Sequence, residues 1–280
     1  MTPLLLRGTE LPVHARTIIV GILNTAPDSF YDGGKYTGLD KAIIHCERMI
    51  EDGCDIIDVG GESTRPGSKP VSYEEERNRV IPVIREIKKK FNVIVSVDTT
   101  KNKIAKEALE DGVDMINDIS GLMFDPEISR TVSEYKAGIV LSHTTSRPVE
   151  MQSKTYYNNL MDDICNYLNN SVKLAEQSGI NRNSIIVDPG FGFGKEVHHN
   201  LLLLKKLSML SKLNKPIMVG TSMKSFIGTF TGSMDINERH EGTIASITIA
   251  VINGASLVRV HNVKEVKRAI NLVDAVKYLN

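Results

Sequence analysis

Eight short apolar stretches recur along the chain, each followed by a polar, glycine-rich turn and a longer segment with helical spacing. The stretches begin at Thr17, Asp55, Val93, Asp114, Gly138, Ser184, Pro216 and Ser256. Nearly continuous runs of Ile, Val and Met are typical of strands buried on both faces of a parallel sheet. The pattern therefore predicts eight strand–helix units.

The segments between these runs read as amphipathic helices. Residues 40–53 (DKAIIHCERMIEDG) end with Gly53, where a left-handed residue commonly terminates a helix. The apolar side chains of this segment follow a helical period: Ala42, Ile43, Cys46, Met49 and Ile50. A second such segment ends in the same way at Gly179.

Eight strand–helix units without a change of composition predict one domain, a closed (β/α)₈ TIM barrel over residues 17–280. A doubly wound open sheet is the alternative, but eight units and a length of 280 residues favour the barrel. Residues 1–16 lie outside the repeat. We expect this N-terminal extension to form a hairpin over the N-terminal end of the barrel.

Composition and charge narrow the class of partner. The chain has 34 basic and 34 acidic residues, so no nucleic-acid or membrane surface is expected as the main partner. No apolar stretch approaches the roughly 18 residues that cross a bilayer, and Arg7 and Glu10 interrupt the apolar start of the chain. Three cysteines without a C-x-x-C pair indicate reduced thiols. We expect a cytoplasmic protein with small-molecule substrates.

Polar or charged residues stand at the end of every predicted strand, where the active sites of such barrels lie. They are Asn24, Glu62–Arg65, Asp98, Asn117–Asp118, His143, Asp188, Ser222–Lys224, Arg259 and His261. A single Asp after a strand often caps the next helix, which is the role expected for Asp118. Eight such ends together predict a site, because each buried polar group needs a partner.

One half of this set is cationic. Lys224, Arg259 and His261 follow the last two strands, the common phosphate position in these barrels. The fork of Arg259 can bind two phosphate oxygens, while Lys224 acts as a point charge. Arg65 adds a further cation from the loop after the second strand.

The other half consists of carboxylates and an amide: Asp98, Asn117 and Asp188. Carboxylates only accept hydrogen bonds, whereas an amide both donates and accepts them. This combination suits the edge of a flat heterocycle with ring N–H and amino groups. Metal ligation by Asp98 or Asp188 is the alternative, but no motif for a tight transition-metal site is present. A Mg²⁺ ion bridging phosphates needs only one or two protein oxygens, and Asn24 can supply one.

Two long polar loops, residues 24–36 and 60–70, are rich in Gly and Pro. Loops at this end of a barrel are first candidates for function, so we expect mobile covers that exclude water. Ordinary surface loops are the alternative.

These residues lie within motifs that resemble those of the dihydropteroate synthase family, from about Thr17 to the last helix. In order they read GILNTAPDSFYDGG, GGESTRPG, SVDTTK, INDISG, DPGFGFGK, GTSMKSFIG and RVHNV. The resemblance implies a TIM barrel, usually a homodimer, and a transferase of folate biosynthesis. Such an enzyme condenses 6-hydroxymethyl-7,8-dihydropterin pyrophosphate with p-aminobenzoate, giving 7,8-dihydropteroate and pyrophosphate, and sulfonamides mimic its acceptor.

The resemblance also implies roles for individual residues. The pterin contacts fall on Asp98, Asn117, Asp188 and Lys224. Pyrophosphate contacts fall on Asn24, Thr64, Arg259 and His261, with Mg²⁺ at Asn24. Aminobenzoate contacts fall on Phe193, Ser225, Thr64 and Arg65. The implied catalytic groups are Lys224, Arg259, His261 and Arg65, and no side-chain nucleophile is needed.

The chain departs from the family pattern at a few positions. Met223 stands where the family usually has Arg, Thr25-Ala26 where Val-Thr is common, and Asn262 where Asp is common. Two alternatives therefore stay open. One is a pterin-binding paralogue with an altered acceptor or no turnover. The other is a methyltetrahydrofolate–corrinoid methyltransferase, which would not need Lys224, Ser225, Arg259 and His261 arranged for pyrophosphate.

Overall fold

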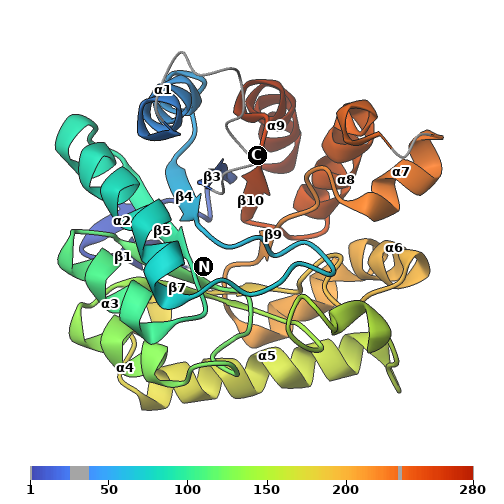
Figure 1. Ribbon diagram of the computed structural model, residues 1–280. Coiled ribbons are helices and arrows are strands. Elements are labelled where there is room, and N and C mark those ends of the chain that lie inside the picture. Colours follow the sequence, from blue (N-terminus) through green and yellow to red (C-terminus); the bar gives the residue numbers. More distant parts are fainter. Residues whose placement is uncertain (1, 26–37, 233–234, 280) are drawn as a thin grey trace.

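The computed structural model describes residues 2–25, 38–232 and 235–279. Within them, eight parallel strands form the sheet at the centre of Figure 1. They are β3 (Ile18–Asn24), β4 (Ile56–Gly60), β5 (Ile94–Asp98), β6 (Met115–Asp118), β7 (Gly138–Ser142), β8 (Ile185–Asp188), β9 (Met218–Val219) and β10 (Leu257–Val260).

The sheet curls almost completely into a barrel. Its strand order is β8-β7-β6-β5-β4-β3-β10-β9. A parallel bridge between Val187 and Ile217 connects the two end strands, and Val187 N donates to Pro216 O at 3.0 Å. The predicted (β/α)₈ barrel is confirmed, and the open doubly wound sheet is excluded.

Helices surround the strands in chain order (Figure 1). They are α1 (Gly38–Glu51), α2 (Tyr73–Lys90), α3 (Asn102–Glu110), α4 (Glu127–Glu134), α5 (Leu160–Gln177), α6 (Val197–Lys205), α7 (Ser225–Thr231), α8 (His240–Ile252) and α9 (Val263–Lys277). Short 3₁₀ turns lie at Met151–Ser153, Arg182–Ser184, Leu207–Leu213 and Ile236–Glu238. Helix α1 stops just before Gly53, whose φ of 91° lies in the left-handed region, as the sequence predicted.

The N-terminal segment forms a two-stranded antiparallel hairpin, β1 (Leu4–Leu6) and β2 (Thr9–Leu11). Its two-residue turn, Arg7-Gly8, has positive φ at both positions, which matches the twist of a tight hairpin. Leu4 and Leu6 are fully buried in one cluster with inward-facing residues such as Ile18 and Leu257 from the starts of the barrel strands. The hairpin therefore packs on the N-terminal end of the barrel.

Side chains alternate between the barrel interior and the helices, as strand geometry requires. In β4, Ile57 and Val59 pack in the main core under the helices, while Ile56 lies in the interior cluster with the hairpin. Asp58 therefore also points inward. The interior is apolar near the strand starts and polar near the strand ends, which places the site at the C-terminal end.

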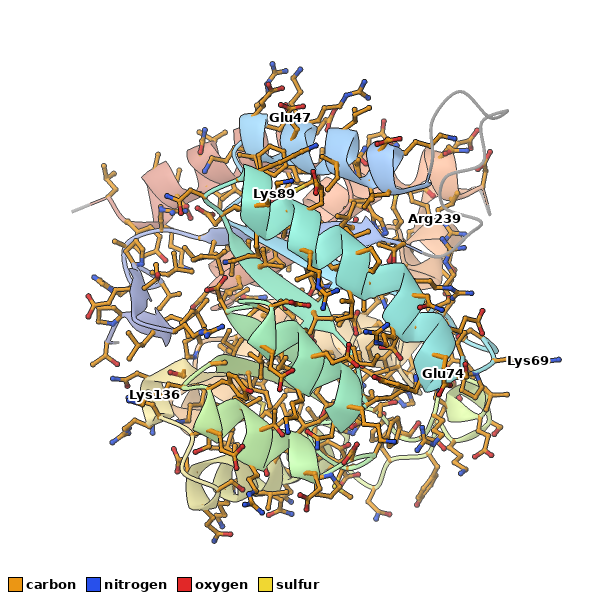
Figure 2. All side chains as sticks on the ribbon, turned by 60° about the vertical axis from the view of Figure 1, so that its left-hand side comes forward. Glu47, Lys69, Glu74, Lys89, Lys136 and Arg239 are labelled. Atoms are coloured by element: carbon orange, nitrogen blue, oxygen red, sulfur yellow. The ribbon has the colours of Figure 1, made fainter. Side chains whose placement is uncertain are left out.

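The outer helix faces carry charge. Glu47 of α1, Lys89 of α2 and Lys136 after α4 are exposed and project from the surface in Figure 2. No helix in the described part of the chain is long and apolar enough to cross a membrane. The cysteines Cys46, Cys54 and Cys165 are buried free thiols.

Candidate active site

A buried ion-pair network centred on Arg259 lies at the C-terminal end of the barrel. Arg259 of β10 donates from Nε to Asp58 Oδ2 of β4 at 2.6 Å, and from Nη2 to Asp98 Oδ2 of β5 at 2.8 Å. Burial raises the pKa of Asp98 to about 7, while the charge of Arg259 acts in the opposite direction. The sequence placed Arg259 and Asp98 in separate halves of the pocket. The structure links the two halves, because the Arg259 guanidinium bonds Asp58 and Asp98 together.

Asn117 of β6 belongs to the same network. Its Nδ2 donates to Asp58 Oδ2 at 3.0 Å. Three buried atoms nearby on adjacent strands, Asp58 Oδ1, Asn117 Oδ1 and Ser96 Oγ, have no hydrogen-bond partner among the described residues. Buried acceptors without donors are costly. The barrel interior is therefore suited to a ligand that brings N–H groups.

Asp188 ends β8 and faces the same space. Its Oδ1 accepts a hydrogen bond from Gly190 N at 2.7 Å. Burial raises the pKa of Asp188 to about 6, and the Gly190 hydrogen bond, Lys224 and Arg259 partly offset that effect. The structure thus brings together the three residues that the sequence grouped for a heterocycle edge.

Lys224 connects this group to Phe193. Burial, followed by the charge of Arg259, lowers the pKa of Lys224 to about 8. Lys224 Nζ lies 4.1 Å from the centre of the Phe193 ring, a cation–π contact. Phe193 is buried in a small cluster with Ile119 and Met151. Ser225, the next residue, begins α7 and is exposed.

Residues 190–195 form the loop that carries Phe193, and Lys195 lies buried inside it. Lys195 Nζ donates to Gly190 O at 2.9 Å and Phe193 O at 3.0 Å, and it lies 2.9 Å from His143 Nδ1. Burial and the Lys195 charge hold the pKa of His143 well below its usual value, so the ring is neutral and its Nδ1 accepts from the Lys195 amino group. His143, a strand-end residue in the sequence analysis, thus supports this loop.

His261 lies at the end of β10 beside Ser222. The Ser222 hydroxyl accepts from His261 N at 3.2 Å and lies 3.0 Å from His261 Nδ1. Burial and the charges of Arg259 and Lys224 lower the pKa of His261 to about 3. The ring is therefore neutral near pH 7. With the hydroxyl proton directed to Nδ1, the ring proton sits on Nε2, and that atom becomes the donor.

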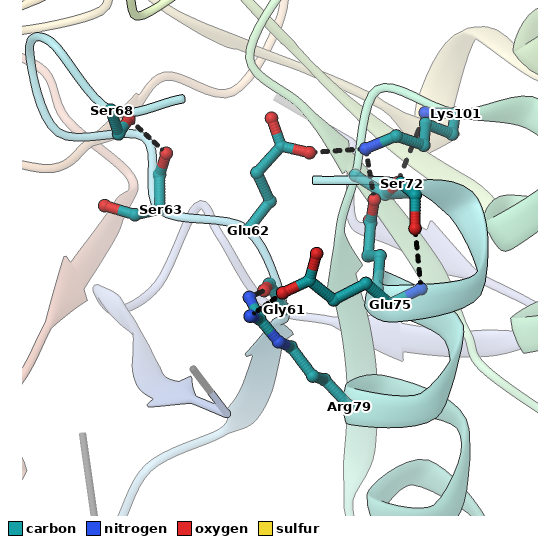
Figure 3. Close-up of polar contacts among 10 residues, drawn as sticks. Gly61, Glu62, Ser63, Ser68, Ser72, Glu75, Arg79 and Lys101 are labelled. Carbon is teal, nitrogen blue, oxygen red and sulfur yellow. Dashed lines mark hydrogen bonds and ion pairs between the residues drawn. The ribbon is translucent and has the colours of Figure 1, made fainter. Parts of the chain in front are cut away.

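The loop after β4 is anchored at its base, as Figure 3 shows. Lys101 forms ion pairs with Glu62 and Glu76, and Arg79 donates to Gly61 O at 2.7 Å. Glu76 is fully buried. These contacts fix where the loop leaves the strand.

The tip of the same loop folds on itself and contacts the loop after β7. Ser68 Oγ donates to Arg65 O at 2.6 Å, and Gly67 N donates to Pro148 O at 2.8 Å. Thr64 lines a small cavity together with Asp98. Arg65 is exposed, and its charge contributes to the lowered pKa values of Lys224 and His261. The loop therefore stands at the edge of the site, while Lys69 projects outward (Figure 2).

Comparison with known proteins identifies the family. The family model described as "Pterin binding enzyme" matches residues 20–261. The chain belongs to the pterin-binding enzyme family. It is 45% identical to dihydropteroate synthase of Bacillus subtilis over 96% of this chain and 92% of that protein. It is 43% identical to that of Clostridium beijerinckii over 95% of this chain and 97% of that protein.

Solved structures of dihydropteroate synthases share the fold of this chain over nearly its whole length. The Yersinia pestis enzyme in complex with a sulfonamide drug matches with a TM-score of 0.92 and 39% identity over 99% of both chains. The Xanthomonas albilineans enzyme with 4-aminobenzoic acid matches with a TM-score of 0.93 and 36% identity over the full length of both. The resemblance read from the motifs is confirmed.

Asn24 ends β3 in this pterin-binding barrel. A Cβ placed on Gly60 would lie 3.7 Å from Asn24 Oδ1 and 3.6 Å from Asp98 Cβ, so these two side chains flank Gly60. Residues 26–37, with Ala26 and most of the first predicted cover, lie outside the described residues. Among the described residues, no group of three or more His, Cys, Asp or Glu could hold a metal ion.

Met223, the main departure from the family pattern, lies in a backbone position held by neighbours. Its φ is 59°, its N donates to Thr243 Oγ1 at 3.1 Å, and its O accepts from Arg239 Nη1 at 2.8 Å. Asn262 precedes α9, with Nδ2 lying 2.8 Å from His240 Nδ1. Both departures therefore contact α8 or the residue just before it.

Sequence reasoning missed Asp58 and Lys195. Asp58 sits inside an apolar run, where it was counted as part of the strand. The alternation of side chains along the strand could have identified Asp58. It lies two residues from Ile56 and two from Gly60, so all three face the same side of the sheet. Lys195 is the last residue of the motif DPGFGFGK. The sequence of this motif does not indicate which groups the lysine contacts, because those contacts form only in the folded loop.

Proposed function

We propose that the protein is a dihydropteroate synthase, joining 6-hydroxymethyl-7,8-dihydropterin pyrophosphate to p-aminobenzoate. The observation that carries this proposal is the shared network in which Arg259 bonds Asp58 and Asp98 beside Asp188, Lys224 and His261. Such a site offers acceptors for an amino-heterocycle and cations for its phosphates at the same end of the barrel. The synthase relatives and their aminobenzoate complex support the same substrates.

The pterin ring binds in the barrel interior. The Asp188 carboxylate and the Asn117 amide oxygen accept from ring N–H and amino groups, while Asp98 and Lys224 complete the edge. Because Asp98 and Asp188 are buried, each hydrogen bond to the ring replaces water with fixed partners. The ring is thereby held in one orientation.

Cationic donors hold the pyrophosphate. Arg259 uses Nε and Nη2 for carboxylates, and its Nη1 makes no hydrogen bond to any described residue, which leaves that atom for a phosphate oxygen. His261 donates from Nε2, and Lys224 adds charge. We propose Asn24 and Thr64 as further contacts of the pyrophosphate. These groups stabilise the negative charge that develops on the leaving pyrophosphate.

The reaction is a substitution at the pterin methylene carbon. Its bond to the pyrophosphate oxygen breaks, the aminobenzoate nitrogen forms the new C–N bond, and a proton leaves that nitrogen. Phe193 offers a flat face for the benzoate ring, and Ser225 offers a hydroxyl for its carboxylate. We propose that Arg65 and Thr64 contact the p-aminobenzoate from the outer side. No side-chain nucleophile enters this scheme.

Asn24 fits a Mg²⁺ ion held mainly by substrate. Mg²⁺ favours oxygen ligands and retains several waters, so one amide oxygen with phosphate oxygens is a suitable donor set. When bound, the ion would neutralise charge on the pyrophosphate. We propose Asn24 as its protein ligand.

We also propose that two copies of the chain associate. Helix α8 buries Ile247 and Val251, yet Ile249 and Ile252 on its other face are 46% and 54% exposed. Phe230 on the neighbouring α7 is 61% exposed. A second copy would cover this apolar surface.

Ile249→Arg should lower the mass measured by light scattering to that of a monomer, whereas Leu272→Arg on α9 should not. An unchanged mass would count against this interface.

The cytoplasm is the proposed location, because buried reduced thiols suit that compartment. Burial raises the pKa of Cys46 and Cys54 to about 12, which keeps both thiols unreactive.

Pyrophosphate release tests the proposed function. The protein would be mixed with pterin pyrophosphate and Mg²⁺, with and without p-aminobenzoate. Release that depends on p-aminobenzoate supports the synthase. Tight pterin binding without acceptor-dependent release supports a paralogue with an altered acceptor or no turnover. No pterin-pyrophosphate binding contradicts the proposal.

A further inference from the structure

Asp58 holds two groups of the site with one oxygen. Its Oδ2 accepts from Arg259 Nε at 2.6 Å and from Asn117 Nδ2 at 3.0 Å, and the side chain is fully buried. The three residues come from β10, β4 and β6, so this oxygen connects separate walls of the barrel. Truncating Asp58 would leave two buried donors without an acceptor.

The hydrogen bond to Asp58 fixes the orientation of the Asn117 side-chain amide. An amide presents a donor on one side and an acceptor on the other. Because Nδ2 is committed to Asp58, the oxygen Oδ1 is the end left over, and it has no partner among the described residues. Asn117 is thereby presented to a ligand as an acceptor.

The contact to Arg259 decides the position of the guanidinium. Asp58 takes Nε and Asp98 takes Nη2, so the planar group is held at two of its three nitrogens. A fork fixed in this way keeps its remaining donors in one direction. The Asp58 carboxylate therefore positions a group that would contact the heterocycle and a group that would contact the phosphates.

From this arrangement, we infer that Asp58 is a positioning residue, which sets Asn117 as a hydrogen-bond acceptor for the pterin and aims Arg259 at the pyrophosphate. This inference rests on the proposed function for the identity of the ligand. Asp58 acts through its two partners and needs no contact with the substrate.

Two neutral variants separate the acceptor from the charge. In Asp58→Asn, the amide oxygen can still accept from Asn117 and Arg259, whereas Asp58→Leu has a similar shape and no acceptor. We expect Asp58→Leu to weaken pterin-pyrophosphate binding, measured by calorimetry, at least tenfold. Asp58→Asn should lose much less, and the KM for p-aminobenzoate should stay within twofold in both.

Asp55→Leu is the matched control. Asp55 precedes the same strand and also pairs with an arginine, Arg16, at 2.7 Å, but it lies at the opposite end of the barrel. This variant should lower the melting temperature and leave pterin affinity within twofold. A merely structural role for Asp58 would give the same result as Asp55.

A double-mutant cycle tests whether Asp58 acts through Asn117. The effect of Asp58→Leu on pterin affinity should become smaller in an Asn117→Ala background, and the part that remains is the part transmitted through Arg259. Should Asp58→Leu fail to fold, hydrogen exchange of the Asn117 side-chain amide in the wild-type protein gives a second test. Slow exchange supports the Asp58 contact, and exchange as fast as that of an exposed amide overturns it.

The outcomes distinguish this inference from the proposed function. If the wild-type protein does not bind pterin pyrophosphate, the proposed function fails. If it binds and Asp58→Leu binds equally well, the inference is wrong. Equal losses in Asp58→Asn and Asp58→Leu would also overturn it, because the charge alone would then matter.

Discussion

Arg259 of β10 and Asp98 of β5 form a 2.8 Å ion pair across the interior of the barrel. The pair connects a group suited to phosphate with a group suited to a heterocycle. An anion at Arg259 Nη1 would share one guanidinium with Asp98, so the two parts of the substrate are recognised by one electrostatic network. Substitutions on either side should therefore affect pterin-pyrophosphate binding as a whole.

Asp188→Asn should abolish tight pterin binding while the protein stays folded. The amide oxygen can still accept from Gly190 N, but the charge that accepts from the ring donors is lost. A loss of about 3 kcal/mol, or roughly a hundredfold in Kd, is expected for a charged buried hydrogen bond. Calorimetry with the pterin pyrophosphate measures it.

Asp118→Asn provides the control for that experiment. Its buried carboxylate accepts from Ser120 N at 2.8 Å and Leu122 N at 2.7 Å, so it organises the loop after β6. Asp118→Asn should lower stability and leave pterin affinity nearly unchanged. Unchanged affinity in Asp188→Asn itself would refute the role given to Asp188.

Ser222→Ala should lower kcat about two- to tenfold. Without the hydroxyl, nothing directs the His261 ring proton to Nε2, and the contacts to both Nδ1 and the main-chain N of His261 are lost, each worth about 1 kcal/mol. Steady-state pyrophosphate release gives kcat. Ser246→Ala, which removes a hydroxyl bonded to Thr221 and not to His261, should keep the wild-type rate. Equal rates in Ser222→Ala and wild type would contradict the tautomer assignment.

Lys195→Met should change how stability depends on pH. Burial lowers the pKa of Lys195 to about 7 in the folded protein, whereas the unfolded chain keeps its proton to about 10.5. The unfolded state therefore binds more protons between these values, and Lys195 makes stability rise with pH. From pH 7 to 9 the wild-type protein should gain about 2 kcal/mol relative to Lys195→Met.

Urea unfolding at both pH values measures this gain. Other titrating groups cancel when the wild-type and variant free energies of unfolding are subtracted. Lys212→Met removes a half-exposed lysine and serves as the control. A wild-type-minus-variant difference that is the same at pH 7 and pH 9 would argue against a depressed pKa at Lys195.

Met223→Arg should leave activity equal or raise it. The contacts that hold residue 223 use its main-chain N and O, to Thr243 and Arg239, and an arginine keeps both. The added cation stands next to Lys224, which favours an anionic substrate. The KM for pterin pyrophosphate measures the effect, and Met209→Arg on the surface controls for charge. A large fall in activity would show a loop reorganised around methionine.

The fold and much of the candidate site were accessible from the sequence because they follow from local patterns. Runs of β-branched residues, helical spacing and Gly53 predict strands, helices and their ends without knowledge of distant contacts. The strand ends also located Asp98, Asn117 and Asp188, since parallel strands bring their carboxyl ends to one side.

The contacts between those residues were not accessible, because they depend on barrel closure. Asp58 and Arg259 are 201 positions apart, and only the closed sheet places β4 and β10 two strands from each other. The pairing of Lys195 with His143 likewise depends on how two loops pack: a Cβ on Gly190 would lie 1.9 Å from His143 O. Residue type and spacing carry no signal for such packing.

Mass spectrometry of the reaction products tests whether the protein makes dihydropteroate. Wild-type protein would be incubated with the pterin pyrophosphate, p-aminobenzoate and Mg²⁺, and both products would be quantified. We expect 7,8-dihydropteroate and pyrophosphate in equal amounts, and neither from Asp188→Asn at the same substrate concentrations. Pyrophosphate without dihydropteroate, or no reaction despite tight pterin binding, would contradict it.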